Sequence, residues 1–513
     1  MISVVNIKIK GVDISPAIRP LVQSFFGNIT YNYEYIEDEE EESVGESAES
    51  AKVSGSGAGR SKKAPAEPVS EGDSLDVYCE FERDTASCKI FHNGELKEEG
   101  REEDMPIAIS EYRYKAGRLV YDLLKNVTGK ELPWGILVGI RPTKHVYEAL
   151  EQGRDLDSIR DEMSGKFYVS DSRIETAIRI ANCERKILSS FDYKKGYSIY
   201  IGIPFCPSTC LYCSFASYPV EQFGHLMDDY LTSLERELAY ASMCMPLKNL
   251  NTIYVGGGTP TALSEEGLER LLRMIHRYLP VEKCLEFSVE AGRPDSVNEA
   301  KLKLLKDYGV TRISINPQTF VQRTLDLIGR KHDVDSVLRA YEAARNVGHD
   351  NINMDLIVGL TGETPKDVEE TLKYVEKLSP ESLTVHTLAI KRAARLKIEN
   401  ETYRGMAATG IPEMIEMTME YAREHRYHPY YLYRQKNMAE NLENTGYAKP
   451  GKEGLYNILI MEEKQPIIAL GAGATTKMVY NNGDILRVEN VKSLPDYIGR
   501  VDEMIERKRT ITG

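Results

Sequence analysis

Long apolar runs are missing from this 513-residue sequence: none approaches the ~20 residues that a helix needs to cross a bilayer. The first ten residues alternate Val and Ile with Asn and Lys, and they lack the apolar core of a signal peptide. Excess positive charge is missing as well, because the formal net charge is −14. These absences predict a cytoplasmic protein without a membrane span, and they leave nucleic-acid binding without electrostatic support.

Cysteine is scarce, and its eight copies have no regular spacing that predicts a disulfide framework. Three of them stand together as Cys206, Cys210 and Cys213, in a C-x3-C-x2-C array that follows an apolar alternating stretch at residues 197–203. This pattern predicts a strand that leads into a loop with three thiolates. Thiolates are soft ligands that suit zinc, copper(I) or iron–sulfur clusters.

The array has no second cysteine pair, because the cysteines that follow it, Cys244 and Cys284, stand alone. Structural zinc sites use four closed ligands, commonly from two C-x2-C arms, so zinc is the weaker interpretation. Three cysteines on a four-iron cluster leave one iron without a protein ligand. That iron is open to a substrate or a cofactor, which predicts a reactive site.

With Tyr212 before its third cysteine, the array resembles the motif of the radical S-adenosylmethionine (SAM) enzymes. The longer stretch 200–206 resembles the branch that contains oxygen-independent coproporphyrinogen III oxidase, and residues 132–144 resemble a coproporphyrinogen-dehydrogenase-like subgroup of anaerobic Gram-positive bacteria. The resemblance implies that the three cysteines hold a [4Fe–4S] cluster whose open iron chelates SAM. Reduction by one electron would then cleave SAM to a 5′-deoxyadenosyl radical.

The resemblance also implies SAM contacts at or near the ends of successive predicted strands. The glycine run that begins at Gly256 lets backbone approach a ligand closely and resembles the motif that binds the SAM amino group. Gln318 and Asp355 correspond to residues that bind the ribose hydroxyls, and Arg330 to the residue that pairs with the methionine carboxylate. Taken alone, each position has a structural alternative, such as a tight turn or a rim carboxylate; together, they favour SAM binding. The full predicted set, in which Ile357 and Ala389 flank the adenine and Glu290 contacts the methionine or ribose, is Tyr200, Tyr212, Gly256, Gly257, Gly258, Thr259, Glu290, Gln318, Arg330, Asp355, Ile357 and Ala389.

Short apolar runs alternate with helical patterns over the middle of the sequence, which predicts an α/β fold with a parallel sheet and right-handed crossovers. Six such strand–helix units indicate a partial (β/α)6 barrel, which is also the fold that the resemblance implies. Functional residues are then expected at the carboxyl ends of the strands. The predicted strands are residues 197–203, 252–255, 285–289, 312–315, 352–358 and 383–388.

The sequence around the barrel predicts smaller domains of the α+β class. Residues 75–81 and 88–92 alternate as a hairpin does, closed by Asn93 and Gly94. A stretch rich in acidic residues, Ser and Gly interrupts this N-terminal part and is predicted to be disordered. The predicted organisation is an N-terminal α+β domain at 1–36 and 74–130 around a disordered linker at 37–73, a partly helical connector at 131–196, the barrel at 197–394 and an α+β C-terminal domain at 395–513 that covers the barrel opening.

Two positions depart from established coproporphyrinogen oxidases, which carry a histidine at the place of Gly202 and a further cysteine at the place of Phe215. Neither position is a cluster ligand, so the resemblance still implies SAM cleavage. The leading hypothesis is oxygen-independent oxidative decarboxylation of coproporphyrinogen III to protoporphyrinogen IX. A radical SAM methyltransferase that acts on haem and a haem chaperone with a SAM-binding cluster are the alternatives.

The expected partners are a porphyrin(ogen) or haem substrate and an electron donor such as flavodoxin or ferredoxin. Residues 428–437 are dense in aromatic and basic groups, which suit the face and the propionates of a macrocycle. An edge strand with exposed tyrosines explains the same stretch equally well. His386 is either a core histidine or a residue that faces the substrate.

Overall fold

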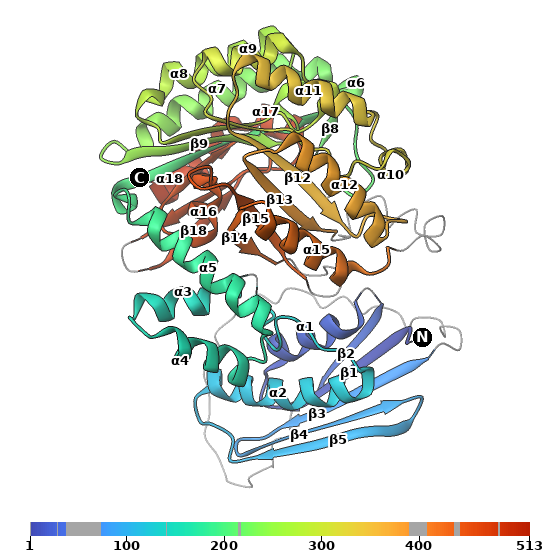
Figure 1. Cartoon of the computed structure of the whole chain (residues 1–513). Helices are drawn as coiled ribbons and strands as arrows, with labels where there is room; N and C mark the ends of the chain where they lie inside the picture. The colour runs from blue at the N-terminus through green and yellow to red at the C-terminus, as the bar shows by residue number, and fades with distance from the viewer. Residues whose placement is uncertain are drawn as a thin grey trace, which may run out of the picture. The chain divides into compact units, whose positions relative to one another are not determined.

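The computed structural model describes residues 2–27, 29–36, 73–139, 141–213, 217–388, 408–434, 442–480 and 483–512. Contacts divide the chain into two compact units: Met1–Val138 with Glu162–Ser170, and Gly139–Asp161 with Asp171–Gly513. Each unit is built on its own main sheet (Figure 1). Among the described residues, no helix has both the length and the apolar character that crossing a membrane requires. The predicted linker, apart from Asp73, lies outside the described residues, as do Phe215 and Ala389.

The smaller unit contains β1 (Val4–Gly11), α1 (Ser15–Phe26), β2 (Thr30–Ile36), β3 (Ser74–Phe81), β4 (Thr85–His92), β5 (Glu95–Glu103) and α2 (Ile109–Thr128). Its sheet has the order β2-β1-β3-β4-β5. β1 pairs parallel with both β2 and β3, while β4 pairs antiparallel with β3 and β5. Residues of β1 alternate between buried and partly exposed, because α1 and α2 cover one face of the sheet (Figure 1).

Residues 75–81 and 88–92 pair antiparallel as expected, but the Asn93-Gly94 turn does not connect them. The turn joins β4 to β5, so this part of the prediction is wrong. Asn93 and Gly94 have φ angles of 51° and 80°, the left-handed backbone of a tight hairpin turn. β5 escaped prediction because its residues are almost all charged or polar and show no apolar alternation.

The larger unit contains an eleven-stranded sheet, and its six central strands are β6 (Gly196–Ile203), β9 (Asn249–Gly257), β10 (Glu286–Glu290), β11 (Arg312–Ser314), β12 (Ile352–Val358) and β13 (Ser382–Thr387). Each neighbouring pair among the six is parallel. The main crossover helices are α7 (Met227–Cys244), α8 (Glu265–Tyr278), α9 (Glu299–Asp307), α11 (Val334–Val347) and α12 (Pro365–Leu378). Nearly every residue of β6 and β12 is buried, as expected for a parallel sheet covered by helices. The predicted α/β class with a partial (β/α)6 barrel is confirmed.

Residues after these six strands extend the same sheet at both edges. β16 (Ile467–Leu470) pairs parallel with β6, and β17 (Thr475–Val479) and β18 (Ile485–Glu489) follow antiparallel. At the other edge, β15 (Asn444–Ala448) pairs antiparallel with β13, and β14 (His428–Tyr433) pairs with β15. The domain boundaries expected from the sequence remain predictions.

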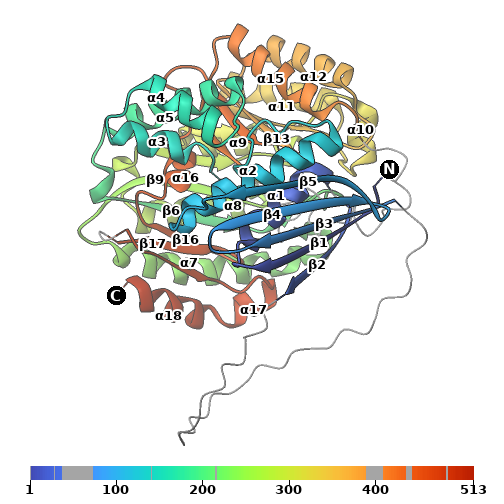
Figure 2. The ribbon, with the colours of Figure 1, turned by 90° about the horizontal axis from the view of Figure 1, so that it is seen from below.

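Further helices of this unit are α3 (Lys144–Glu151), α4 (Leu156–Asp161), α5 (Asp171–Leu188), α6 (Val220–Phe223), α10 (Gln322–Leu327), α15 (Ile411–Glu424), α16 (Leu455–Glu462), α17 (Leu494–Gly499) and α18 (Val501–Thr512). α18 lies beside α7 (Figure 2), and their contact buries an ion pair between Lys508 and Glu237 whose side chains are both 0% exposed. Tyr497 and Asn490 donate hydrogen bonds to the same carboxylate at 2.7 Å each. This network ties the last helices to the barrel.

Candidate functional site

A cavity of about 530 Å³ extends from the carboxyl ends of the central strands into the barrel. Of the predicted site residues, those that line it are Tyr200, Cys206, Cys210, Tyr212, Cys213, Gly257, Gly258, Thr259, Glu290, Gln318, Arg330 and Asp355. Gly256 directly precedes this lining, and Ile357 lies in a small apolar cluster beside Tyr212. The cavity therefore gathers side chains that the sequence spreads over many residues, as parallel strands with a common carboxyl edge do.

The three cysteines lie where β6 passes into a short strand and a loop. Cys206 ends β7 (Phe205–Cys206), and the Cys213 backbone N–H donates to the Cys210 carbonyl at 3.1 Å. All three cysteines line the same cavity, and three thiolates there suit a cluster in which each thiolate binds a different iron.

Arg293 and Thr259 each donate a hydrogen bond to one of these sulfurs. The Arg293 guanidinium lies 3.5 Å from Cys210 Sγ, and the Thr259 hydroxyl lies 3.5 Å from Cys206 Sγ. Asp295 holds Arg293 through two contacts of 2.6 and 2.8 Å. Burial raises the pKa of Cys206 to about 11, so its charged thiolate depends on a bound cation and on such donors.

Arg293 was missed in the sequence analysis, although it follows Glu290 by three residues after the same strand. An arginine at a strand end beside a predicted site is the signal that could have found it. Its side chain is only 4% exposed and also donates to the Ser208 carbonyl at 3.2 Å. Arg293 therefore binds both the backbone of the cysteine loop and the sulfur of one of its cysteines.

The glycine run at the end of β9 places its backbone against the cysteine loop. The N–H groups of Gly258 and Thr259 donate to the carbonyl oxygens of Ile203 and Phe205, at 2.9 and 2.7 Å. A Cβ atom on Gly258 would lie 2.8 Å from both oxygens, closer than side chains come to backbone. Gly257 has a φ of 105°, which residues with a side chain rarely adopt. Glycine is therefore required at both positions by local geometry.

Glu290, at the end of β10, is held by Tyr254 and by the glycine run. The Tyr254 hydroxyl donates to its carboxylate at 2.6 Å, and the Gly257 N–H donates to it at 3.3 Å. Burial raises the pKa of Glu290 to about 7, and the nearby Asp355 carboxylate acts in the same direction. Glu290 can therefore serve as a hydrogen-bond acceptor or as a donor near neutral pH.

Three stacked tyrosine rings, from Tyr200, Tyr254 and Tyr456, form what we call the tyrosine wall of the cavity. The ring centroid of Tyr254 lies 4.5 Å from that of Tyr456 and 6.2 Å from that of Tyr200. Tyr431 and Tyr433 of β14 line the same cavity, and Tyr431 is buried. β14 is an edge strand, but these two tyrosines do not lie on an exposed face, which excludes that alternative for them.

Asp355 and His386, from neighbouring strands, both line the cavity. The Asn353 amide donates to Asp355 at 2.7 Å, and His386 Nε2 lies 3.9 Å from the second carboxylate oxygen. Burial favours the neutral carboxyl, but the histidine and the amide outweigh it and hold the pKa of Asp355 below its ordinary value. Asp355 is therefore an ionised acceptor at neutral pH, and His386 belongs to the cavity lining.

Gln318 and Arg330 supply the remaining predicted polar groups. The backbone of Gln318 has a φ of 69° and bonds to that of Asp355 at 3.0 Å, while its buried Oε1 has no hydrogen-bond partner among the described residues. Arg330 is buried and donates to the Asn316 carbonyl at 2.7 Å and to the Tyr212 hydroxyl at 3.2 Å. An orphaned buried acceptor and an anchored guanidinium that line the same cavity suit a polar ligand that bonds to both.

Comparison with known proteins gives the family. The sequence model of the Radical SAM superfamily matches residues 200–375. The oxygen-independent coproporphyrinogen-III oxidase-like protein HemZ of Bacillus subtilis (strain 168) is 40% identical over 392 residues, which cover 75% of this chain and 78% of that protein. The chain belongs to the radical SAM superfamily, in its coproporphyrinogen III oxidase-like branch. The resemblance stated from the motifs is confirmed.

Two other comparisons agree with this assignment. The heme chaperone HemW of Bacillus subtilis (strain 168) is 34% identical over 316 residues, which cover 60% of this radical SAM protein and 76% of the chaperone. The solved coproporphyrinogen III oxidase (HemN) of Escherichia coli has a TM-score of 0.50 at 22% identity, covering 63% of this chain and 73% of that one, and supports the fold alone. Radical SAM proteins bind a [4Fe–4S] cluster and SAM, so these are the cofactors of this protein.

Proposed function

We propose that this radical SAM protein is an enzyme that acts on a tetrapyrrole, bound between its cysteine loop and its tyrosine wall. One observation carries the proposal: three thiols, a set of polar groups suited to SAM and a stack of aromatic rings line a single cavity. The names of two relatives, which refer to coproporphyrinogen III and to haem, support a tetrapyrrole as the substrate class.

Cys206, Cys210 and Cys213 are the proposed ligands of the [4Fe–4S] cluster. Radical cleavage of SAM is the chemistry that this cluster supplies when bound. The hydrogen bonds from Arg293 and Thr259 stabilise negative charge on two of the sulfurs, and such bonds tune the reduction potential of iron–sulfur centres. A flavodoxin or a ferredoxin is the proposed class of electron donor.

The polar groups around the cysteines are proposed to hold SAM. The unpaired Gln318 Oε1 and the ionised Asp355 are acceptors, which suit the two ribose hydroxyls. The Arg330 guanidinium suits the methionine carboxylate, because its planar donors match a carboxylate. The other proposed contacts are Tyr200, Tyr212, Gly256, Gly257, Gly258, Thr259, Glu290, Ile357 and Ala389.

The tyrosine wall is proposed to lie against the macrocycle. Aromatic faces stack on planar rings and exclude water from the site. In the leading reaction, two propionate groups of coproporphyrinogen III become vinyl groups, each with loss of CO2, one hydrogen atom and one electron. The balance requires one SAM per propionate as the oxidant, which ends as methionine and 5′-deoxyadenosine. The product is protoporphyrinogen IX.

A haem chaperone is the second candidate, because the 34% identity to a heme chaperone covers most of that protein's length. The deciding experiment incubates the anaerobically reconstituted full-length protein with SAM, a reductant and coproporphyrinogen III, and analyses products by mass spectrometry. We expect 5′-deoxyadenosine to rise with the porphyrinogen, and the porphyrinogen to lose CO2 and two hydrogens at each of two positions. A methylated macrocycle would identify a haem methyltransferase, and tight haem binding without turnover would identify a chaperone. No 5′-deoxyadenosine with any tetrapyrrole would contradict an enzymatic function.

A further inference from the structure

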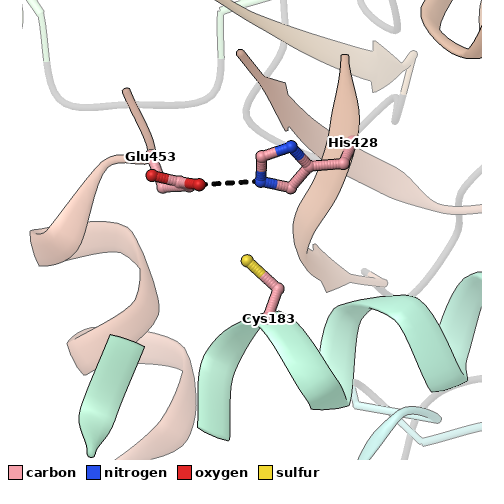
Figure 3. Close-up of side chains that lie close together, drawn as sticks. All are labelled: Cys183, His428 and Glu453. Atoms are coloured by element: carbon pink, nitrogen blue, oxygen red, sulfur yellow. Dashed lines mark hydrogen bonds and ion pairs between the residues drawn. The ribbon is translucent and has the colours of Figure 1, made fainter. Parts of the chain in front are cut away.

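Three potential metal ligands from distant parts of the sequence meet in the larger unit (Figure 3). Cys183 lies on α5, His428 is the first residue of β14, and Glu453 stands just before α16. One ligand atom from each residue lies within 4.8 Å of the other two. The sequence analysis gave none of them a role as a ligand, because no short spacing connects them.

The geometry of the three side chains is that of converging ligands. His428 Nε2 and Glu453 Oε1 are 2.8 Å apart, and the Cys183 sulfur points toward the space beside this pair (Figure 3). The Gly451 backbone N–H donates to Glu453 Oε1 at 3.3 Å and so helps to orient the carboxylate. Cys183 is half-buried and forms no disulfide within the described ranges. The side chains of His428 and Glu453 are 30% and 14% exposed, which leaves an access path.

We propose that Cys183, His428 and Glu453 bind one Zn²⁺ ion, with water as the fourth ligand. A thiolate, an imidazole and a carboxylate form a donor set that zinc accepts, whereas Mg²⁺ and Ca²⁺ prefer oxygen ligands alone. Two nitrogen or oxygen ligands at about 2.0–2.1 Å from a tetrahedral zinc ion lie roughly 3.3 Å apart. The observed 2.8 Å contact therefore needs to open by only a fraction of an ångström.

Charge and proton count agree with a divalent cation. The thiolate and the carboxylate together carry two negative charges, and a neutral imidazole adds none, so Zn²⁺ makes the site neutral. Zinc binds the thiolate form, so binding releases the thiol proton to solvent.

The site is separate from the proposed cluster site. His428 pairs with Ala448, and Ala448 pairs with Ser382, the first residue of β13. The three ligands therefore lie near the amino ends of the parallel strands. Cys206, by contrast, lies just past the carboxyl end of β6.

The ion would link α5 to two elements that line the cavity. β14, which begins at His428, carries Tyr431 and Tyr433, and α16 follows Glu453 and carries Tyr456 of the tyrosine wall. A cation shared by α5, β14 and the start of α16 would thus fix the positions of these tyrosine rings relative to one another. With three protein ligands and a water, the ion keeps one open position and so differs from a closed structural zinc site, and its binding is independent of the reaction proposed for the cavity.

The test measures zinc in the full-length protein with Cys206, Cys210 and Cys213 changed to alanine, so that no cluster iron competes. We expect about one zinc per chain to survive dialysis against a weak chelator, and about a tenfold or greater loss of affinity in Cys183→Ala and Glu453→Gln. Cys244→Ala is the matched control, because Cys244 is also a half-buried helical cysteine and has no such neighbours. It should keep the zinc.

Cobalt(II) substitution gives a second readout, which in the chain that keeps Cys183 does not depend on the folding of the Cys183 or Glu453 variants. Cobalt bound to a thiolate produces a charge-transfer band, which we expect in the protein with Cys183 present and in Cys244→Ala, and not in Cys183→Ala. Equal zinc retention in Cys183→Ala and Cys244→Ala would overturn the proposal. So would the absence of both retained zinc and a cobalt–thiolate band in the chain that keeps Cys183.

Discussion

The guanidinium of Arg293 lies 3.5 Å from the sulfur of Cys210, while Asp295 holds its other side at 2.6 Å. A positive charge is thereby fixed against one of the three cysteines by a residue that the motif itself does not contain. With a cluster bound, this donor would stabilise the added electron of the reduced state. The contact links the loop after β10 to the reactivity of the cysteine loop.

Arg293→Gln is expected to lower the reduction potential of the cluster and to slow SAM cleavage about 10- to 100-fold, because it removes a charged donor next to a ligand. The measurements are a potentiometric titration followed by electron paramagnetic resonance and the rate of 5′-deoxyadenosine formation. Arg339→Gln is the control, since that side chain is 69% exposed, pairs with Asp333 and does not line the cavity. Equal potentials in the two variants would exclude an electrostatic role for Arg293.

Gly258→Ala is expected to destabilise the fold by about 1–3 kcal/mol and to abolish SAM binding, because the added Cβ would meet two carbonyl oxygens at 2.8 Å. Thermal unfolding and equilibrium dialysis with labelled SAM measure the two effects. Gly267→Ala serves as the comparison: its Cβ would find ordinary contacts of 3.5 Å or more in α8. That change should leave SAM binding intact and stability unchanged or slightly higher. Normal SAM binding by Gly258→Ala would show that the glycine run is not part of the SAM site.

The free energy of unfolding should depend on pH through the titration of Glu290. Burial raises its pKa from the ordinary 4.5 to about 7, so the folded state holds a proton that the unfolded state has lost in this interval. Relative to Glu290→Gln, the unmodified protein should therefore lose stability as pH rises from about 4.5 to about 7. Denaturant unfolding of the cluster-free chain at several pH values measures the difference. A difference between the two proteins that stays constant across this range would show that Glu290 keeps an ordinary pKa.

Lys508→Met is expected to lower the free energy of unfolding by about 3–5 kcal/mol, because it leaves the buried Glu237 carboxylate without its cation. Pairing it with Glu237→Gln should recover part of that loss, since no charge is then left buried. Lys303→Met removes a pair whose side chains are 66% and 54% exposed, and should change stability by no more than about 1 kcal/mol. Equal effects of the two lysine changes would show that the inner ion pair contributes no more than a surface one.

The parallel strands could be predicted because their apolar runs and the helical patterns between them follow rules that act over a few residues. The same holds for the cysteine array and the glycine run, which stand next to strand ends in the sequence. β5 could not be predicted, because its polar sequence has no apolar alternation and it becomes a strand only by pairing with a neighbouring strand. The tyrosine wall joins Tyr200 and Tyr254 to Tyr456 of α16, and only tertiary contact shows that these rings stack. Cys183 and His428 could not be predicted as metal ligands from the sequence, because they are far apart in it and only the fold brings them together.

β16 covers the edge of β6, and its residues Ile467–Leu470 run beside Ser198–Ile201, just before the cysteine loop. A ribosome makes this neighbour long after it has made the strand that it covers. Until β16 is made, β6 lacks the strand that pairs with this side of it, although the cysteine loop has already left the exit tunnel of the ribosome. Delivery of iron and sulfide is thus expected to follow synthesis of β16.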